Sequence, residues 1–259
     1  MSRLKALVLR APGTNCDGET SWALEAAGAP TDRVHVNALL RGEVHLKDYG
    51  LLVFPGGFSF GDDIASGKVL ANRVIYRLQE QLDDFLRLGR PVLGICNGFQ
   101  VLVKAGLLPG TSDGRSSVPT ASLMDNDSGV FECRWIFLKT SADNFWTRGL
   151  PEVFPLPVAH GEGKFVSDPV SLRRLDRAGQ IVFRYTTSQG KKPRYPDNPN
   201  GSEGDIAAVT NPAGNVLGLM PHPERNSFPN QTPFSKTHAL QSVGLKIFKN
   251  AVRYAAQVN

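Results

Sequence analysis

The sequence predicts an α/β protein in which helices flank a doubly wound, mostly parallel sheet with an appended antiparallel patch. Two segments, Gly50–Phe54 and Val92–Ile95, are almost wholly apolar, as is typical of strands buried on both faces of a parallel sheet. Between them, Val69–Leu88 carries apolar residues at helical spacing. This alternation indicates parallel strands joined by right-handed crossovers. We expect the 259 residues to form a single domain, because no repeat or linker divides them.

The first half of the chain adds two strands and a helix to these elements. Lys5–Arg10 is predicted to be a buried strand that leads into a loop of turn-forming residues. The predicted helix Glu19–Ala27 follows and ends at Gly28. Asp32–Asn37 alternates between polar and apolar residues, which predicts another strand. The spacing in Val69–Leu88 predicts one continuous helix.

The second half changes character after Leu107. Short alternating segments predict the antiparallel patch, and the turn residues Asn211–Gly214 predict a hairpin near the end of the chain. The segments expected to hold strands are Val118–Thr140, Val153–Val166, Gln180–Thr186, Ile206–Thr210 and Val216–Met220, and those expected to be helical are Ser171–Arg177 and Ala239–Ala255.

Composition narrows the function classes. The net charge is +5 and the pI about 9.2, but the basic residues are scattered, so we expect no nucleic-acid partner. The first apolar run, Ala6–Leu9, is too short for a signal peptide, and no segment could span a bilayer, so we expect a cytoplasmic protein with no membrane partner. The three cysteines, Cys16, Cys96 and Cys133, lack metal-ligand spacing with the five histidines, which indicates free thiols and no metal.

Cys96 is the candidate nucleophile. It follows the apolar run Val92–Ile95, lies between Gly94 and Gly98, and precedes a predicted helix, Phe99–Ala105. A strand, a sharp turn with a nucleophile at its apex and a helix form the nucleophile elbow, in which flanking glycines avoid collisions. The helix N-terminus behind the thiol would stabilise a thiolate. The alternative is a buried cysteine that simply ends a strand.

A second constellation, Met220-Pro221-His222-Pro223-Glu224, supplies the base that Cys96 needs. Met220 and His222 both precede proline, which favours extended backbone, so His222 and Glu224 would project to the same side. The carboxylate could then orient the imidazole while the other ring nitrogen faces Cys96, as in a catalytic triad. The alternative is a solvated His and Glu at a strand end. Arg225 could pair with Glu224 or with another subunit.

Two backbone N–H groups are candidates for an oxyanion hole. In an elbow the residue after the nucleophile, here Asn97, donates one of them. Gly57 lies where the apolar strand Gly50–Phe54 leaves the sheet, and a glycine there lets the backbone approach a substrate closely. A phosphate-binding loop is the alternative for this glycine-rich turn, but the P-loop pattern is absent and Lys68 fits no such register.

Six segments carry a resemblance to a known family: Pro12–Asp17 (PGTNCD), Pro55–Asp62 (PGGFSFGD), Gly94–Gln100 (GICNGFQ), His160–Phe165 (HGEGKF), Asn198–Ser202 (NPNGS) and Gly214–Arg225 (GNVLGLMPHPER). With these motifs the chain resembles the class I (triad) glutamine amidotransferases, and more narrowly the glutaminase subunits of phosphoribosylformylglycinamidine synthase. The elbow and the His-Pro-Glu segment are common to the superfamily. The other motifs are specific to these subunits, and the resemblance runs nearly from end to end.

The resemblance implies a flavodoxin-like class I amidotransferase fold and a glutaminase reaction. Cys96 would attack the side-chain amide of glutamine, form a γ-glutamyl thioester and release ammonia. His222 would move the protons, and Glu224 would orient His222. The residues implied to bind the glutamine are Gln100, Ala159, His160, Gly161 and Glu162.

The resemblance also implies partners. Ammonia would pass through a tunnel to a separate synthetase subunit that converts formylglycinamide ribonucleotide to formylglycinamidine ribonucleotide in purine biosynthesis, and a small bridging subunit would complete the assembly. No cofactor is expected in this chain, whereas ATP and Mg²⁺ are expected on the synthetase subunit. Ser112–Asn126 and Ser188–Asp197 look longer than in shorter family members. Partner contact and plain insertion are equal explanations.

For several residues, and for the function of the chain, the sequence leaves more than one interpretation open. Cys16 is expected to be structural or to lie at an interface, because the sequence places no base near it, and Cys133 is expected in the core. His160 is a rival base for Cys96, although its glycine neighbours favour a backbone segment that lines the substrate. A free-standing cysteine hydrolase of amides or γ-glutamyl compounds is the alternative enzyme, and a non-catalytic scaffold is the alternative outside enzymes.

Overall fold

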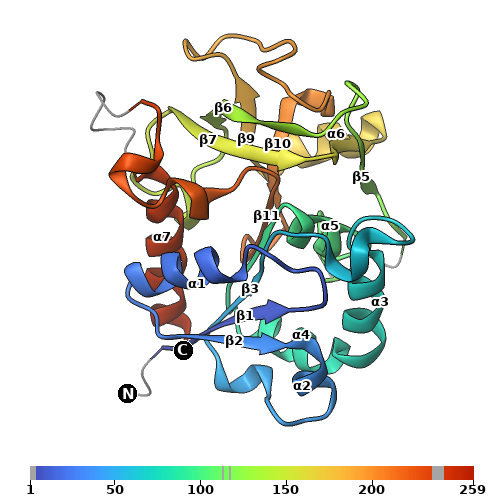
Figure 1. Cartoon of the computed structure of the whole chain (residues 1–259). Helices are drawn as coiled ribbons and strands as arrows, with labels where there is room; N and C mark the ends of the chain where they lie inside the picture. The colour runs from blue at the N-terminus through green and yellow to red at the C-terminus, as the bar shows by residue number, and fades with distance from the viewer. Residues whose placement is uncertain (1–3, 113, 117, 235–241) are drawn as a thin grey trace.

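The computed structural model describes residues 4–112, 114–116, 118–234 and 242–259 (Figure 1). Its largest element is a nine-stranded sheet with the strand order β2-β1-β3-β4-β11-β10-β9-β6-β7. The strands of this sheet are β1 (Ala6–Arg10), β2 (Thr31–His35), β3 (Leu51–Phe54), β4 (Val92–Ile95), β6 (Glu132–Thr140), β7 (Val153–His160), β9 (Ile181–Thr186), β10 (Ile206–Thr210) and β11 (Val216–Leu219).

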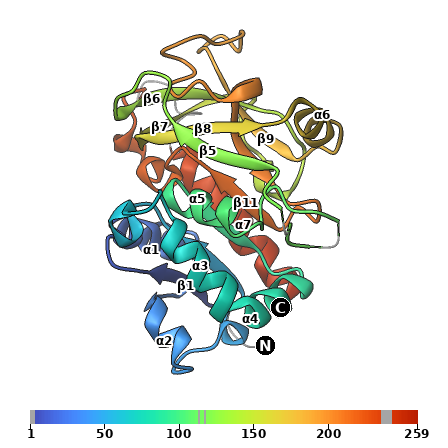
Figure 2. The same cartoon turned by 90° about the vertical axis from the view of Figure 1, so that its right-hand side faces the viewer.

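The half of the sheet from β2 to β11 is parallel and doubly wound, as the sequence predicts. Helix α1 (Asp17–Ala26) leads from β1 to β2 in one direction, whereas α3 (Lys68–Arg77) and α4 (Gln79–Arg87) lead from β3 to β4 in the other. Because both crossovers are right-handed, opposite directions place the helices on opposite faces. Helix α1 accordingly packs with the C-terminal α7 (Val243–Val258), and α3 packs with α5 (Asn97–Lys104) (Figure 2).

The antiparallel patch continues the same sheet. Strands β10, β9, β6 and β7 extend it beyond β11, and every pairing among them is antiparallel. Only β5 (Ala121–Asp125) and β8 (Glu162–Ser167) form a separate two-stranded sheet. Strand β8 follows β7 directly through a turn at Gly161, so this turn leads from the large sheet to the small one.

One predicted helix was wrong in its extent. The predicted helix Val69–Leu88 is broken at Leu78, whose φ of −121° is not helical. The break lets α3 and α4 turn separate apolar faces inward, and Leu78 itself is buried. The start predicted for the closing helix, at residues 239–241, lies outside the described residues, and the described helix α7 spans Val243–Val258. No described helix is both long enough and apolar enough to cross a membrane.

Two shorter helices and two long segments are the remaining features of the fold. The residues after β2 form α2 (Val36–Leu40), and α6 (Pro169–Arg177) lies where the sequence predicts a helix.

Within the first of the two long segments, Ser112–Asn126, the chain forms β5, whereas the second, Ser188–Asp197, has no regular structure apart from turns. Tyr195 in that loop is 60% exposed, and the Arg134 guanidinium lies 5.3 Å from its ring centroid. Partner contact by these segments stays a prediction.

The elbow between β4 and α5 forms at the centre of the sheet. Cys96 has φ +50° and ψ −106°, a strained backbone conformation for a residue with a side chain. Helix α5 lies so close to β3 that a Cβ on Gly98 would come within 1.9 Å of the Phe54 carbonyl oxygen. On the other flank, a Cβ on Gly94 would lie 2.8 Å from the Gly98 carbonyl oxygen. A side chain at either glycine would therefore collide with neighbouring backbone atoms.

This packing predicts the effect of adding one methyl group at Gly98. Gly98→Ala should lower the free energy of unfolding by at least about 3 kcal/mol, because backbone atoms rather than mobile side chains meet the new Cβ. Gly18→Ala in α1 is the matched control, since its Cβ would meet only the Arg33 Nη1 atom at 3.8 Å. The control should be neutral or stabilising by up to about 1 kcal/mol. Urea unfolding of the two variants gives the comparison, and equal stabilities would contradict the close approach.

Candidate active site

Four adjacent parallel strands, β1, β3, β4 and β11, end at one side of the site, and the turn from β7 into β8 carries the predicted residues Ala159–Glu162. The loops that follow the four parallel strands carry Cys16, Gly57, Cys96 and His222. Chain connections leave β1 and β3 in opposite directions, and such a switch point is where open α/β sheets bind ligands. A cavity of about 280 Å³ opens there. Its lining includes all predicted site residues except Asn97 and Glu224, namely Cys96, His222, Gly57, Gln100, Ala159, His160, Gly161 and Glu162.

Cys96 faces this cavity from the apex of the elbow. The residue is buried, with 6% of its surface exposed, and its Sγ donates a hydrogen bond to the Ala159 carbonyl oxygen over 3.6 Å. Ala159 belongs to β7, in the antiparallel half of the sheet. The thiol is thus held between the two halves and has a ligand-sized space in front of it.

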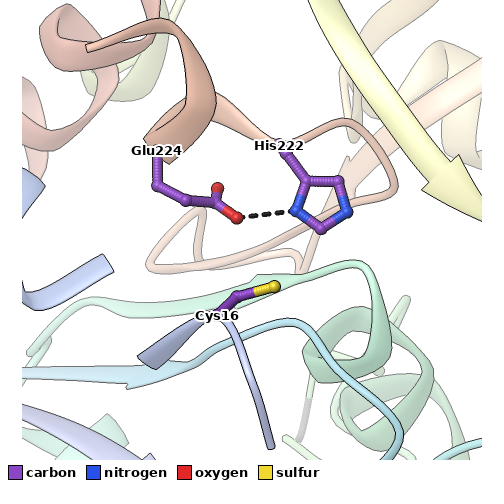
Figure 3. A group of neighbouring side chains, drawn as sticks. All are labelled: Cys16, His222 and Glu224. Atoms are coloured by element: carbon purple, nitrogen blue, oxygen red, sulfur yellow. Dashed lines mark hydrogen bonds and ion pairs between the residues drawn. The ribbon is translucent and has the colours of Figure 1, made fainter. Parts of the chain in front are cut away.

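His222 and Glu224 form a buried pair, shown in Figure 3. The His222 Nδ1 atom lies 2.6 Å from Glu224 Oε1, and each residue is 1% exposed. The His222 backbone is extended (φ −102°), and its N–H donates to the Pro157 carbonyl oxygen of β7. Glu224, however, lies in a short 3₁₀ helix, Pro223–Asn226. The predicted contact therefore forms, but the predicted reason, a wholly extended segment, was wrong.

The environment of His222 favours its charged form. Burial alone lowers the pKa of His222, but the Glu224 carboxylate, with Cys96 and Cys16 beside the ring, raises this pKa well above its usual value. The Nε2 atom of His222 has no hydrogen-bond partner among the described residues. A buried imidazolium with one free N–H is suited to donate a proton to a group bound in the cavity.

The predicted oxyanion donors, the backbone N–H groups of Gly57 and Asn97, belong to the loop after β3 and to the start of α5. Gly57 has φ +137°, and an added Cβ would lie 2.7 Å from the Asn15 nitrogen, so only glycine fits there. Within the described chain, no acceptor is bonded to the N–H of Gly57 or of Asn97. The Asn97 side chain has a role that the sequence did not reveal. It accepts from the Ser59 N–H over 3.1 Å and donates to Asp62 Oδ1 over 3.1 Å, which fixes the loop after β3.

Gln100 connects the elbow helix to the turn between β7 and β8. Its Nε2 donates to the Glu162 carbonyl oxygen over 2.6 Å, and its Oε1 accepts from Asn97 Nδ2 over 3.0 Å. The Ala159–Glu162 segment therefore covers the cavity from the side opposite the parallel strands. The side chain of Gln100 holds this wall in place.

His160 is a poor candidate for a base. Its Nδ1 lies 3.0 Å from Asn126 Oδ1, and its Nε2 lies 3.5 Å from the Asn200 Nδ2. Burial, together with the charge of His222, lowers the pKa of His160 to about 3. The ring therefore stays neutral between two amides. Asn126 and Asn200 were not identified from the sequence as a pair, because they lie far from His160 along the chain.

The cysteines differ from their predicted surroundings. Cys133 was predicted to be in the core but is exposed, and it lines the same cavity as Cys16 and Cys96. Cys16 was expected to have no base nearby, yet the fold brings it beside His222 (Figure 3). Burial raises the pKa of Cys16, and its Sγ donates to Asn15 Oδ1 over 3.2 Å.

Arg225 was expected to pair with Glu224 or another subunit. Instead its Nε donates to Glu19 Oε1 over 2.8 Å, and its Nη2 donates to Cys16 Sγ over 3.3 Å. Arg225 therefore joins α1 to the segment that carries His222.

Comparison with known proteins identifies the family. Residues 3–255 match the CobB/CobQ-like glutamine amidotransferase domain. Two similar relatives are phosphoribosylformylglycinamidine synthase subunits PurQ. The one from Dehalococcoides mccartyi is 45% identical over 100% of both chains, and the one from Methanococcus maripaludis is 40% identical over 96% of this chain and 97% of its own. A solved structure, that of PurLQS from Thermotoga maritima, contains a chain that is 31% identical, with a TM-score of 0.73 over 97% of this chain and 99% of that one.

The family model spans nearly the whole chain, and both relatives exceed 30% identity over almost their full length. The chain therefore belongs to the CobB/CobQ-like glutamine amidotransferase family and, within it, to the PurQ subunits of phosphoribosylformylglycinamidine synthase.

Proposed function

We propose that this chain hydrolyses glutamine to glutamate and ammonia, and that Cys96, His222 and Glu224 perform the reaction. One observation carries the proposal: the elbow thiol and the buried His222–Glu224 pair line or adjoin the same ligand-sized cavity. A cavity of about 280 Å³ is at the lower end of the small-molecule range of roughly 300–1,000 Å³, which suits an amino acid.

In the first half of the reaction, the Cys96 sulfur attacks the side-chain carbonyl carbon of glutamine. The C–N bond breaks, and the leaving nitrogen takes a proton from His222 Nε2, so that ammonia departs and a γ-glutamyl thioester remains. The raised pKa of His222 keeps that proton available, and Glu224 stabilises the imidazolium. The backbone N–H groups of Gly57 and Asn97 stabilise the oxyanion that forms in each tetrahedral intermediate.

In the second half, the neutral His222 removes a proton from water, and the hydroxide attacks the thioester. Glutamate leaves, and the proton returns to the Cys96–His222 pair, so the enzyme is restored. The amino-acid end of glutamine is bound by Gln100 and by the wall formed by Ala159, His160, Gly161 and Glu162. The His160 ring, which is buried and neutral, is not expected to carry charge toward the substrate.

We further propose that the ammonia is delivered to a synthetase subunit that converts formylglycinamide ribonucleotide to formylglycinamidine ribonucleotide, with a small bridging subunit in the assembly. The names of the relatives and the PurLQS structure support such partners. The cavity mouth also suits a covering protein, because Phe58 and Phe131 line it with 48% and 51% of their surfaces exposed. ATP and Mg²⁺ would bind to the synthetase subunit.

Replacing the nucleophile tests the reaction. Cys96→Ala should lower glutamine hydrolysis by at least about 10⁴-fold, because no other group can form the thioester. The purified chain is measured alone and with the synthetase and bridging subunits. Activity that rises on assembly supports a partner-gated ammonia donor, whereas full activity without partners would identify a free-standing amide hydrolase.

Two controls make this result specific. In the assembled enzyme, the Cys96→Ala complex should still use free ammonia, which shows that its fold and its docking are intact. Cys133→Ala removes an exposed thiol from the same cavity and should keep glutaminase activity within a few-fold. Undiminished glutamine use by the Cys96→Ala complex would overturn the mechanism.

Neutralising Glu224 tests the electrostatic role of the pair. In Glu224→Gln the main influence that raises the pKa of His222 is gone, so burial prevails and this pKa falls. NMR of ¹⁵N-labelled histidine should show a charged His222 at neutral pH in the wild type and a neutral one in the variant. Glutamine turnover should fall by about 10²–10⁴-fold.

Glu19→Gln is the matched control for this measurement. It removes a carboxylate that pairs with Arg225 rather than with His222, so His222 should stay charged at neutral pH. If the pKa of His222 were the same in Glu224→Gln as in the wild type, Glu224 would not be the stabilising partner.

A further inference from the structure

We propose that Cys16, His222 and Glu224 form a binding site for Zn²⁺, and that the bound ion reversibly inhibits the enzyme. The inhibition rests on the proposed catalytic role of His222, whereas the binding does not. A thiolate, an imidazole and a carboxylate are the three donor types that zinc sites use. Cys16 lies near one end of the sequence and His222 and Glu224 near the other, so no short sequence motif predicts the site.

The donor atoms are close enough to share an ion. One donor atom from each of the three residues lies within 4.8 Å of the other two. Zinc bond lengths of about 2.0–2.3 Å place two donors of a tetrahedral site roughly 3.3–3.8 Å apart. The most widely spaced donors of the three side chains (Figure 3) would thus need to approach by on the order of 1 Å, whereas His222 Nδ1 and Glu224 Oε1, now 2.6 Å apart, would separate slightly if both bound the ion.

The cluster also has buried polar atoms with unused capacity. Glu224 Oε2 and His222 Nε2 have no hydrogen-bond partner in the described part of the chain, although both residues are 1% exposed. Buried polar atoms without partners are rare and call for an explanation such as an ion. The hydrogen bond between His222 Nδ1 and Glu224 Oε1, at 2.6 Å, leaves the other donor atom of each side chain available to an ion.

Charge and access suit a divalent cation. The Cys16 thiolate and the Glu224 carboxylate together neutralise Zn²⁺. Arg225 donates to Cys16 Sγ over 3.3 Å, which favours the thiolate, and Glu19, 2.8 Å from Arg225, balances the charge of the guanidinium. Cys16 and His222 line the cavity, which gives the ion a path and leaves room for water as a fourth ligand. Behind the cluster, a Cβ on Gly56 would lie within about 3.0 Å of both Cys16 Sγ and His222 Cε1, so the backbone there holds the two side chains together.

The site lies within the catalytic machinery, and this determines its effect. An ion bound to His222 takes the lone pair that the reaction uses to move protons, and it engages the carboxylate that stabilises the imidazolium. Glutamine hydrolysis should therefore stop while the ion is bound and resume when a chelator removes it. The nucleophile, Cys96, is not a ligand in this arrangement.

Binding is tested directly with Co²⁺ as a spectroscopic probe on the full chain. The wild type should bind one Co²⁺ with a thiolate-to-cobalt absorption band, and Cys96→Ala and Cys133→Ala should do the same. Cys16→Ser should lose the band and bind at least about 100-fold more weakly, since even loss of an outer-shell partner reduces metal affinity by about 10–100-fold. An unchanged Cys16→Ser, or loss of the band in Cys96→Ala, would overturn the proposal.

Inhibition is tested separately with Zn²⁺ in the glutaminase assay. The activity of each protein with Zn²⁺ is divided by its own activity without Zn²⁺. Cys16→Ser should need at least about 100-fold more Zn²⁺ than the wild type for half-inhibition. Equal sensitivity would overturn inhibition through this site. If no assembly hydrolyses glutamine, the proposed function fails, while the cobalt measurement still decides the binding. Thermal unfolding of Cys16→Ser shows whether the variant folds, and Cys16→Ala replaces it if it does not.

Discussion

Helix α5 meets strand β3 at backbone distance, and the position of Cys96, the proposed nucleophile, depends on this contact. The absence of a side chain at Gly98 lets the helix axis approach the Phe54 carbonyl, and this places the helix N-terminus directly behind Cys96. The strained backbone of Cys96 persists because the surrounding sheet and helix leave it no other conformation. Rigid elements on both sides thus aim the Cys96 thiol at the cavity.

The other half of the site is fixed by contacts with the antiparallel extension. Strand β7 supplies the Ala159 carbonyl to the Cys96 thiol and the Pro157 carbonyl to the His222 N–H. Gln100 ties the elbow helix to the turn that follows β7. These bonds all use backbone groups as one partner, so they constrain the geometry of the site without requiring particular side chains on β7. The antiparallel strands therefore serve as the second wall of the active site.

Local sequence patterns predicted a large part of this arrangement. The apolar strands β3 and β4, the elbow and the His222–Glu224 pair all arise from neighbouring residues whose constraints act over short distances. The break at Leu78 was missed because the apolar spacing runs through it, and the packing of two helix faces against the sheet decides where the helix ends. The contact of Cys16 with Arg225, like the amides around His160, joins residues far apart in sequence, which no local pattern records.

Strand β11 lies between β4 and β10 at the middle of the sheet, although it comes last in chain order among the strands that the structure describes. The elbow can form once β3, β4 and α5 are available, but His222 arrives only when Val216–Leu219 inserts beside β4. Such long-range pairing is a late step of folding, because loop closure must precede it. A chain that has folded only as far as α5 therefore holds the Cys96 thiol without the His222 imidazole, and the two groups come together only when β11 is in place.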